Sequence, residues 1–485
     1  MIEFKNKIVQ LGFGAVGKSF FEKVSKEIDF DKNKYFVISR DKLEYTFFLE
    51  LGGHVGNFIV TDITRKNFKK IFSNHLDEGD FLIDFTDGVG TKDFVEWCAN
   101  ENVMYLNTGE TDWDDNWYNI FEENLKKNEL RNLLKEKNNV NKYPIVLQHG
   151  NNPGLVSHFV KAGLEYIVKK QFKNNIELNM LLEQNKFNEL AKELDLKEIH
   201  VNDNDYQEVK DDFDANKLYS TWSVDSFFFE MLSESTVNIG THEQVVYSKE
   251  YKNRDVKNGF LEFKDLAIDK VGKTYYPKGK FEGFVVPHEE TITIAKSLEV
   301  KSGEEVIYRP TVIFLYSPCD FAVKYLKSAR VNDYSNEDID KPQNIENNII
   351  RGFEYPKRAE IIYKEQIKDG TEYVGVLLLG SKFNPVWVGN RIKKNFLYKD
   401  KKTSFWQTPT NTPVAMSALA ASCWMIKSKN RGGIYFPDDI NEYKEIINFA
   451  EKYISKTIYK TFNKKKIEKE LNINLDNLQF KDIII

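Results

Sequence analysis

The sequence predicts an α/β protein in which a Rossmann-like, doubly wound parallel sheet is followed by an α+β domain with a mostly antiparallel sheet. Over the first 150 residues, short apolar runs alternate with helical patterns, as parallel βαβ units require. A glycine-rich turn follows the first apolar run. From about residue 219 to 400, short alternating runs are separated by Gly and Pro, which is typical of antiparallel strands.

The first domain is expected to span residues 1–150. A helical pattern with one apolar face follows the glycine-rich turn and ends at about Lys26, and a second helix is expected over 92–100. The apolar runs predicted to form strands are 7–11, 35–39, 58–60, 81–85, 103–106 and 145–147.

A substrate and dimerisation domain is expected over residues 151–405. It opens with the turn 151–154, and helices are predicted over 155–168 and 175–200. The segment 332–348 is expected to be a surface loop. The runs predicted to be strands are 291–295, 306–315, 373–379 and 386–388.

The remaining residues, 406–485, are expected to return and pack on the first domain. An apolar helix is predicted over 416–427, a strand follows over 432–437, and amphipathic helices with mixed charges complete the segment.

The composition excludes several classes of protein. Of the 485 residues, 41% are hydrophobic and 29% charged, with a net charge of −5, so we expect no nucleic-acid partner. No apolar run approaches 18 residues, and the N-terminus lacks a signal-peptide pattern, so no membrane partner is expected. The three cysteines, Cys98, Cys319 and Cys423, are widely separated. This spacing is typical of a cytoplasmic protein.

The glycine-rich turn matches the dinucleotide-binding fingerprint GxGxxG, and residues 7–41 are predicted to bind NAD or NADP. The first glycine allows a tight turn, the second lets the pyrophosphate approach the backbone, and the third lets helix and strand pack closely. The alternative is a βαβ glycine turn that binds nothing. The motif residues are Gly12, Phe13, Gly14, Ala15, Val16 and Gly17.

Residues after the second strand choose between the two cofactors. An acid there binds the ribose hydroxyls of NAD, whereas an arginine favours the 2′-phosphate of NADP. Ser39 stands in the acid's place, Arg40 could contact a 2′-phosphate or stack on adenine, and Asp41 could still reach the ribose. These residues leave the choice between NAD and NADP open. Further cofactor contacts are expected from Thr86, Asn107 and Thr108, which follow later strands.

An acidic and aromatic segment distinguishes the second domain. Residues 222–230 contain a tryptophan, two carboxylates and three phenylalanines, with acids also at 203 and 205 and a His-Glu pair at 242–243. If these converge, the pocket binds ammonium groups through charge and cation–π attraction. Such a pocket would repel an α-keto acid.

These residues resemble bacterial-type homospermidine synthases, a branch of the saccharopine dehydrogenase-like group. The similarity runs in family order from about residue 5 to 435. Two motifs are the most specific: His149-Gly-Asn-Asn-Pro-Gly-Leu-Val-Ser157 and Thr221-Trp-Ser-Val-Asp225. The other matching stretches are 9–17, 105–108, 240–243, 287–289 and 375–380.

The resemblance implies an aminobutyl transfer between diamines or polyamines such as putrescine and spermidine. One amine loses a hydride to bound NAD⁺, the imine exchanges with a second amine and releases ammonia, and the same NADH reduces the new imine. The cofactor is thereby recycled without leaving, and the family resemblance implies a homodimer.

The resemblance also assigns roles to six residues. Trp222 faces the cationic intermediate, Glu230 and Asp203 are pocket acids, and Asn152 lies beside the nicotinamide next to Pro153. His288 shuttles protons, and Glu372 falls near a family aspartate. All but Glu372 have a structural alternative: a core tryptophan, a helix-surface glutamate, a turn aspartate, a helix-capping asparagine and a structural histidine. No metal site is expected, because His149 and His158 have no ligand spacing with any Cys or acid.

The sequence departs from the family at three positions. Ser39 replaces the usual acid, the acid of the family's Asn-Thr-x-x-Glu-Pro-Trp run is shifted to Glu110 before Trp113, and Ser226 replaces a glycine. Two other functions stay open. A saccharopine- or carboxynorspermidine-type dehydrogenase would need a basic carboxylate binder, such as Arg309, Arg358 or Arg391. A catalytically inactive dinucleotide-binding protein would be favoured had Trp222 and Glu230 both been lost.

Overall fold

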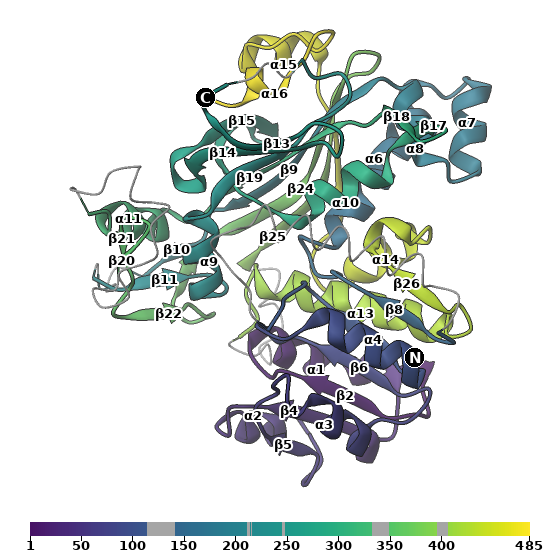
Figure 1. Ribbon diagram of the computed structural model, residues 1–485, viewed down its shortest axis with the longest axis vertical. Helices are drawn as coiled ribbons and strands as arrows, with labels where there is room; N and C mark the ends of the chain where they lie inside the picture. Colours follow the sequence, from purple (N-terminus) through teal and green to yellow (C-terminus); the bar gives the residue numbers. More distant parts are fainter. Residues whose placement is uncertain (114–140, 211–213, 215, 245–247, 332–348, 395–405) are drawn as a thin grey trace.

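The structure, a computed structural model, describes residues 1–113, 141–210, 214, 216–244, 248–331, 349–394 and 406–485. The loop expected over 332–348 lies outside these residues. In the described part, two large sheets lie at opposite ends of the molecule, and helix α13 (Asn411–Lys427) crosses between them (Figure 1).

The first sheet is wholly parallel and has the order β26-β8-β7-β6-β2-β4-β5. The strand order reverses between β2 and β6, which is where a doubly wound sheet binds its ligand. The predicted Rossmann-like fold is confirmed. Its strands are β2 (Ile8–Leu11), β4 (Tyr35–Ser39), β5 (Phe58–Val60), β6 (Phe81–Asp84), β7 (Met104–Asn107), β8 (Pro144–Val146) and β26 (Gly433–Tyr435). Its helices are α1 (Ala15–Glu27), α2 (Glu44–Glu50), α3 (Phe68–His75) and α4 (Thr91–Glu101).

The second sheet is antiparallel except where β9 and β19 pair in parallel. Its main path runs β13-β14-β12-β19-β9-β24-β25-β27, with β16 joining β19 and β15 joining β16. The mostly antiparallel second sheet is thus confirmed. The strands are β9 (Leu196–Asp205), β12 (Glu234–Asn238), β13 (Tyr251–Asp255), β14 (Phe260–Leu266), β15 (Val271–Tyr276), β16 (Gly279–Val285), β19 (Thr311–Ser317), β24 (Thr371–Gly380), β25 (Val386–Lys393) and β27 (Ile458–Thr461).

Helices cover both faces of this sheet. Apolar side chains of β9 and β24 pack with α6 on one face, in a core that continues into the Rossmann domain. On the other face, side chains of β24 and β15 pack with the C-terminal helices. The helices are α6 (Leu155–Gln171), α7 (Ile176–Glu183), α8 (Phe187–Glu193), α9 (Val224–Met231), α10 (Glu289–Ser297), α11 (Asp320–Ser328), α14 (Tyr443–Ala450), α15 (Lys464–Leu471) and α16 (Phe480–Ile483).

The segment 406–485 divides between the two sheets. Helix α13 packs on α1, and β26 adds a parallel strand to the Rossmann sheet. However, β27 pairs with β25, and α15 and α16 contact β15 of the second sheet. In Figure 1 these last helices, in yellow, lie at the end of the molecule away from the Rossmann domain.

Two predicted elements are wrong. The expected helix over 175–200 is two helices and a strand, because Asn185 and Asp195 adopt positive φ angles of 55° and 51° that end each helical run. His200 consequently lies in the middle of β9. The expected strand over 291–295 lies within α10, where Glu289 and Glu290 place negative charge on the first turn.

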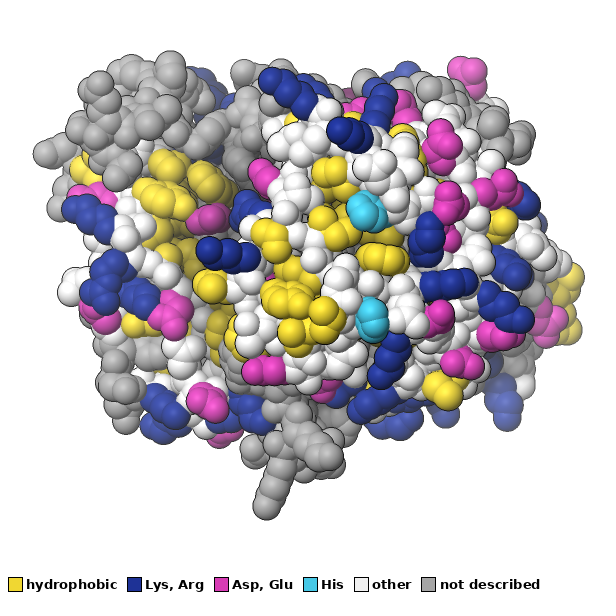
Figure 2. Space-filling model, turned by 90° about the horizontal axis from the view of Figure 1, so that it is seen from below, with side chains coloured by type: hydrophobic (Ala, Val, Ile, Leu, Met, Phe, Trp, Pro, Cys, Tyr) yellow, Lys and Arg dark blue, Asp and Glu magenta, His cyan; other side chains and the backbone are white. Residues whose placement is uncertain are grey.

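Along the described chain, no helix is long and apolar enough to cross a membrane. All three cysteines are buried and free. The face seen from below in Figure 2 intersperses basic and acidic side chains around a central group of hydrophobic ones. Neither sign of charge dominates this face.

Candidate active site

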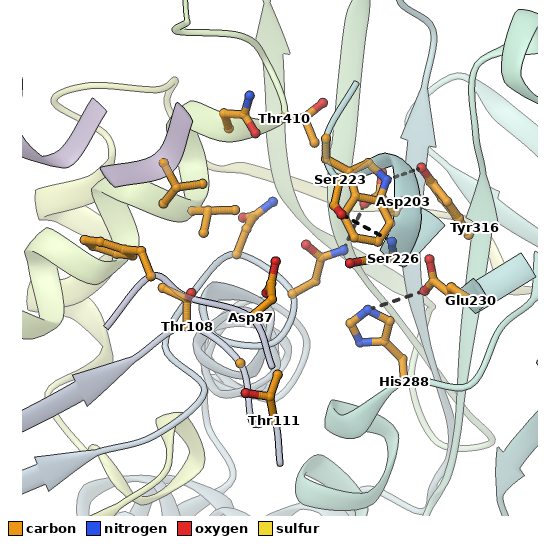
Figure 3. A pocket seen from close by; sticks show the side chains of 18 of the residues that line it. Asp87, Thr108, Thr111, Asp203, Ser223, Ser226, Glu230, His288, Tyr316 and Thr410 are labelled. Carbon is orange, nitrogen blue, oxygen red and sulfur yellow. Dashed lines mark hydrogen bonds and ion pairs between the residues drawn. The ribbon is translucent and has the colours of Figure 1, made fainter. Parts of the chain in front are cut away.

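A cavity of about 280 Å³ lies between the two sheets. Loops after β6 and β7 and the turn before α6 form one side, and the ends of β9 and β19 with α9 form the other (Figure 3). Its lining residues are Val16, Phe85, Thr86, Asp87, Thr108, Gly109, Thr111, Asn151, Asn152, Asp203, Trp222, Ser223, Ser226, Glu230, His288, Phe314, Tyr316, Thr410, Asn411 and Val414.

The glycine turn has the form that a dinucleotide site requires. Gly12 has a φ of 79°, and a Cβ there would lie 2.8 Å from the Phe85 carbonyl oxygen. A Cβ on Gly17 would lie 2.5 Å from the Gly12 carbonyl oxygen, so strand and helix approach closely. Gly14, the N-cap of α1, has no atom within 4 Å of such a Cβ. This leaves open space at a helix N-terminus, which suits a pyrophosphate.

The other cofactor candidates separate into two groups. Thr86 and Thr108 line the cavity together with Val16. Phe13 is 1% exposed and packs edge-on against Phe21, Phe48 and Phe58 in the core. Its side chain is therefore structural, although its backbone belongs to the turn.

The side chain of Asn107 also has a structural role. Its Oδ1 accepts a hydrogen bond from the Gln148 backbone N–H at 2.8 Å. Ser39 is buried at the end of β4, and Arg40 is exposed beside it. Ala15 begins α1 directly after the open space at Gly14. Neither Ser39 nor Arg40 lines the cavity.

A tight turn places Asn152 between the two domains. The Gly150 N–H donates to the Pro153 carbonyl, and a Cβ at Gly154 would overlap the Gly150 backbone. Pro153 is buried below the turn. Asn152 points outward and donates through Nδ2 to Asp203 Oδ2 at 2.9 Å.

Asp203 belongs to a group of three buried carboxyls. Side chains alternate along β9, so Asp203 and Asp205 share one face, and Glu372 on β24 pairs with Asp205. Burial, followed by the charge of Asp205, raises the pKa of Asp203 to about 8. Burial and the charges of Asp203 and Asp205 raise the pKa of Glu372 well above its usual range. Glu372 lies behind Asp203 and outside the cavity lining.

Glu230 reaches the cavity because of its helical spacing. Ser223, Ser226 and Glu230 are three and four residues apart and share one face of α9, while Phe227 and Met231 are buried. The Ser223 hydroxyl accepts a hydrogen bond from the Ser226 N–H and caps the helix. Burial raises the pKa of Glu230 to about 7 despite the opposing charge of His288.

His288 is held between two glutamates and a phenyl ring. Its Nδ1 contacts Glu290 Oε2, its Nε2 lies 3.7 Å from Glu230 Oε1, and it stacks on Phe314 at 4.2 Å between ring centroids. Burial lowers the pKa of His288, but the charge and hydrogen bond of Glu290 and the charge of Glu230 outweigh it and raise the pKa to about 9. The Glu230–His288 pair can therefore exchange a proton near neutral pH.

Trp222 is half-buried at the cavity wall, and its Nε1 donates to the Tyr316 hydroxyl at 3.1 Å. Tyr316 lies opposite Asp203 in the register between β19 and β9. The indole thus forms part of the same wall as the acids, where its face can meet a cation.

Several sequence candidates lie elsewhere. His242 and Glu243 do not line the cavity, so they do not converge with Trp222. Glu110 is buried outside the cavity lining, and Trp113 packs on Phe68 and Phe94. Ser226 does line the cavity, where the family has glycine.

The sequence reasoning missed Asp87, Glu290, Tyr316 and Thr410. Asp87 lies in the cavity wall facing Asp203 and Glu230 (Figure 3). Its position shortly after the carboxyl end of an expected strand was a usable signal. Tyr316 and Thr410 carried no local signal, because only the pairing of β19 and the packing of α13 bring them to the site.

The chain is similar to several known proteins. Residues 8–143 match the saccharopine dehydrogenase NADP binding domain. Homospermidine synthases from Mesorhizobium japonicum and Blastochloris viridis are 25% and 24% identical over 463 residues, covering 93% of this chain and 89% and 90% of theirs.

Solved structures show the same relationship. Homospermidine synthase from Legionella pneumophila, in complex with NAD, superposes with a TM-score of 0.79 at 25% identity, covering 100% of this chain and 98% of that one. Saccharopine dehydrogenase (L-Glu forming) from Saccharomyces cerevisiae shares the fold, with a TM-score of 0.54 at 10% identity, covering 94% of this chain and all of that one. The resemblance of this chain to homospermidine synthases, first drawn from its motifs, is therefore confirmed over 93% of its length.

Proposed function

We propose that this protein is a homospermidine synthase that transfers an aminobutyl group between diamines or polyamines and uses NAD as a recycled cofactor. The observation that carries the proposal is the cavity between the domains. Asp87, Asp203, Glu230 and Trp222 meet there, at the side of the Rossmann sheet where its strand order reverses. An anionic, aromatic cavity next to a dinucleotide turn suits redox chemistry on an amine.

The acids would hold the ammonium groups of the substrate. Asp203 and Glu230 have raised pKa values, to about 8 and 7, so a bound ammonium group would favour their ionised forms. A diamine would thus be drawn to two acids on one wall and to Asp87 on the other. Trp222 would cover the intervening carbon chain and its developing cation.

Proton transfer would fall to Glu230 and His288. The chemistry that NAD supplies when bound is hydride acceptance from a carbon next to an amine and hydride return to an imine carbon. The reacting nitrogen must lose and regain protons between these events. His288, whose pKa is about 9, is protonated at neutral pH, so it can donate a proton through Glu230, held 3.7 Å away, and recover one later. Asn152 would keep Asp203 oriented beside the nicotinamide.

The alternative dehydrogenase function fits less well. A substrate carboxylate needs a cation, and no Lys or Arg from the described residues lines the cavity. Arg309 binds Glu299 and the Ile239 carbonyl, and Arg358 binds Asp214. Arg391 lies over the ring of Tyr373.

The glycine turn supports a dinucleotide cofactor, with Gly12, Gly14 and Gly17 holding it and Thr86 and Thr108 extending toward its nicotinamide end. NAD is proposed because the similar Legionella protein binds NAD in its solved structure, while Ser39 and Arg40 leave NADP as a second ligand. We also propose a homodimer located in the cytoplasm, on the strength of the family resemblance and the three free cysteines.

The test incubates purified protein with putrescine and NAD⁺, without added NADH, and looks for homospermidine by mass spectrometry. Product should form with no net change in absorbance at the NADH band. Glu230→Gln should abolish it, whereas Glu282→Gln, the same change at an exposed acid on β16 that does not line the cavity, should retain it. Steady NAD(P)H consumption that depends on a keto acid would instead establish the dehydrogenase function.

A further inference from the structure

A second group of ionisable side chains lies away from the active site, beneath the C-terminal helices. Each of Glu198, His242 and Glu243 offers one atom that could bind a metal, a carboxylate oxygen or a ring nitrogen, and these three atoms lie within 4.8 Å of one another. Glu198 is on β9, five residues before Asp203. At the rise of a β-strand, that separation is about 17 Å. The group is therefore outside the proposed amine site.

The hydrogen bonds of this group leave two buried atoms unmatched. Glu198 is 0% exposed, and its Oε2 bonds to His200 Nε2 at 2.8 Å, but its Oε1 has no hydrogen-bond partner. The buried His242 Nε2 lies 3.4 Å from Glu243 Oε1 and makes no hydrogen bond either. Buried polar atoms are normally satisfied, so an unmatched acceptor and an unmatched imidazole nitrogen at one spot need a common explanation.

The surrounding residues fix these ligands in place. The His200 ring is held between Glu198 and the Thr274 hydroxyl, which lies 2.9 Å from its Nδ1. Glu243 accepts hydrogen bonds from the Thr311 hydroxyl at 2.5 Å and the Phe480 N–H at 3.1 Å. Such outer hydrogen bonds orient ligands at metal sites.

We propose that Glu198, His242 and Glu243 bind one divalent transition-metal ion of the Zn²⁺ type. Imidazole nitrogen with carboxylate oxygens is a donor set that Zn²⁺ accepts. A cation there would match the unpartnered Glu198 Oε1 and His242 Nε2 together and would offset the two buried carboxylates. Glu243 also lines a separate surface cavity, from which water could reach the ion.

The ion would have a structural role. Glu243 already contacts the N-terminus of α16 through Phe480, and the His242 carbonyl accepts a hydrogen bond from Gln479 Nε2 at 3.1 Å. A metal bridging Glu198 on the sheet to His242 and Glu243 would therefore fasten residues 464–485 to the second sheet. The sequence predicted no metal site from the spacing of His149 and His158. Glu198 is distant from His242 along the chain, so no spacing pattern marks this group.

The first experiment measures metal directly on the full-length protein. After chelator treatment and dialysis against Zn²⁺, elemental mass spectrometry should find about one zinc per chain. Glu198→Gln and His242→Gln each remove a ligand and should lower the bound zinc to well below one ion per chain. Glu262→Gln is the matched control, because Glu262 is a buried carboxyl on β14 of the same sheet that bonds to Asn253 and not to this group. Zinc retained at full stoichiometry in both variants would overturn the proposal.

The second experiment needs no variant, so a variant that fails to fold does not block the test. Co²⁺ added to the metal-free wild-type protein should give visible absorption bands of a low-coordinate site, and Zn²⁺ should abolish them. Zn²⁺ should also slow proteolysis within 464–485. Absence of both effects would refute the site. Neither measurement depends on amine or NAD turnover, so failure of the metal site is distinguishable from failure of the proposed function.

Discussion

Asn152 in the turn before α6 donates a hydrogen bond from Nδ2 to Asp203 Oδ2 on β9 at 2.9 Å, at the cavity between the two sheets. Asn152 comes from the turn after the last Rossmann strand before α6, and Asp203 comes from the central strand of the second sheet. The bond therefore couples the position of the cofactor side of the cavity to the ionisation of an acid on the amine side.

Asn152→Ala should shift the pH dependence of amine binding to higher pH. The Asn152 hydrogen bond lowers the pKa of Asp203, which burial and Asp205 otherwise raise to about 8. Without the bond the carboxyl ionises only at higher pH. The dissociation constant of putrescine, measured from pH 6 to 9 with NAD⁺ present, should reach its lower plateau at higher pH than in the wild type. An unchanged profile would mean that Asp203 does not control amine binding.

Asp203→Asn should weaken amine binding by about 100-fold and yet stabilise the protein. The pKa of Asp203 is raised in the folded state to about 8, so its favourable contribution is complete below its unfolded value and is lost as pH rises through about 8. Asparagine avoids that loss. Thermal unfolding should show a gain in melting temperature that grows from pH 5 to 8. A gain independent of pH would point to packing instead.

Trp222→Ala should lower kcat/KM far more than Trp222→Phe. Phenylalanine keeps an aromatic face for the cation and loses only the bond to Tyr316, whereas alanine removes the face itself. We expect a loss on the order of 100-fold for alanine and under about tenfold for phenylalanine. Tyr316→Phe serves as the control for the lost hydrogen bond. Equal small effects would assign Trp222 to the core.

Glu290→Gln should make kcat fall at a lower pH on the alkaline side of its pH profile. Burial lowers the pKa of His288, and Glu290 provides the largest opposing contribution in raising it to about 9. Removing that charge should return the pKa toward its ordinary value, so the high-pH limb of kcat should fall at lower pH. A limb that does not move would exclude His288 as the proton carrier.

Ser39→Asp should increase the preference for NAD over NADP. An acid at the end of β4 binds ribose hydroxyls and repels a 2′-phosphate. Arg40→Ala should weaken NADP binding and leave NAD binding within a few-fold. Fluorescence titration measures the dissociation constants of NAD and NADP and thereby tests both predictions. If Arg40→Ala weakens both cofactors alike, the side chain stacks on adenine and does not bind the phosphate.

Local sequence is sufficient for the features that depend on neighbouring residues. The turn from Gly12 to Gly17 follows from a backbone that only glycine can adopt or approach, so its fold and ligand class are readable locally. The sequence also predicts the positions of the parallel strands to within a few residues, because each is a short apolar run bounded by polar residues. Asn152, Trp222 and Glu230 are found through motifs that specify local turns and helix faces.

Convergence of distant side chains depends instead on tertiary pairing. The pattern of 175–200 predicts helix throughout, but its last residues, with Glu198 and His200, belong to β9, which pairs between β19 and β24. That pairing places Asp203 opposite Tyr316 at one end of β9 and brings Glu198 into the His242 group at the other. Strand pairing joins residues that are distant along the chain, so no local pattern marks which side chains will meet.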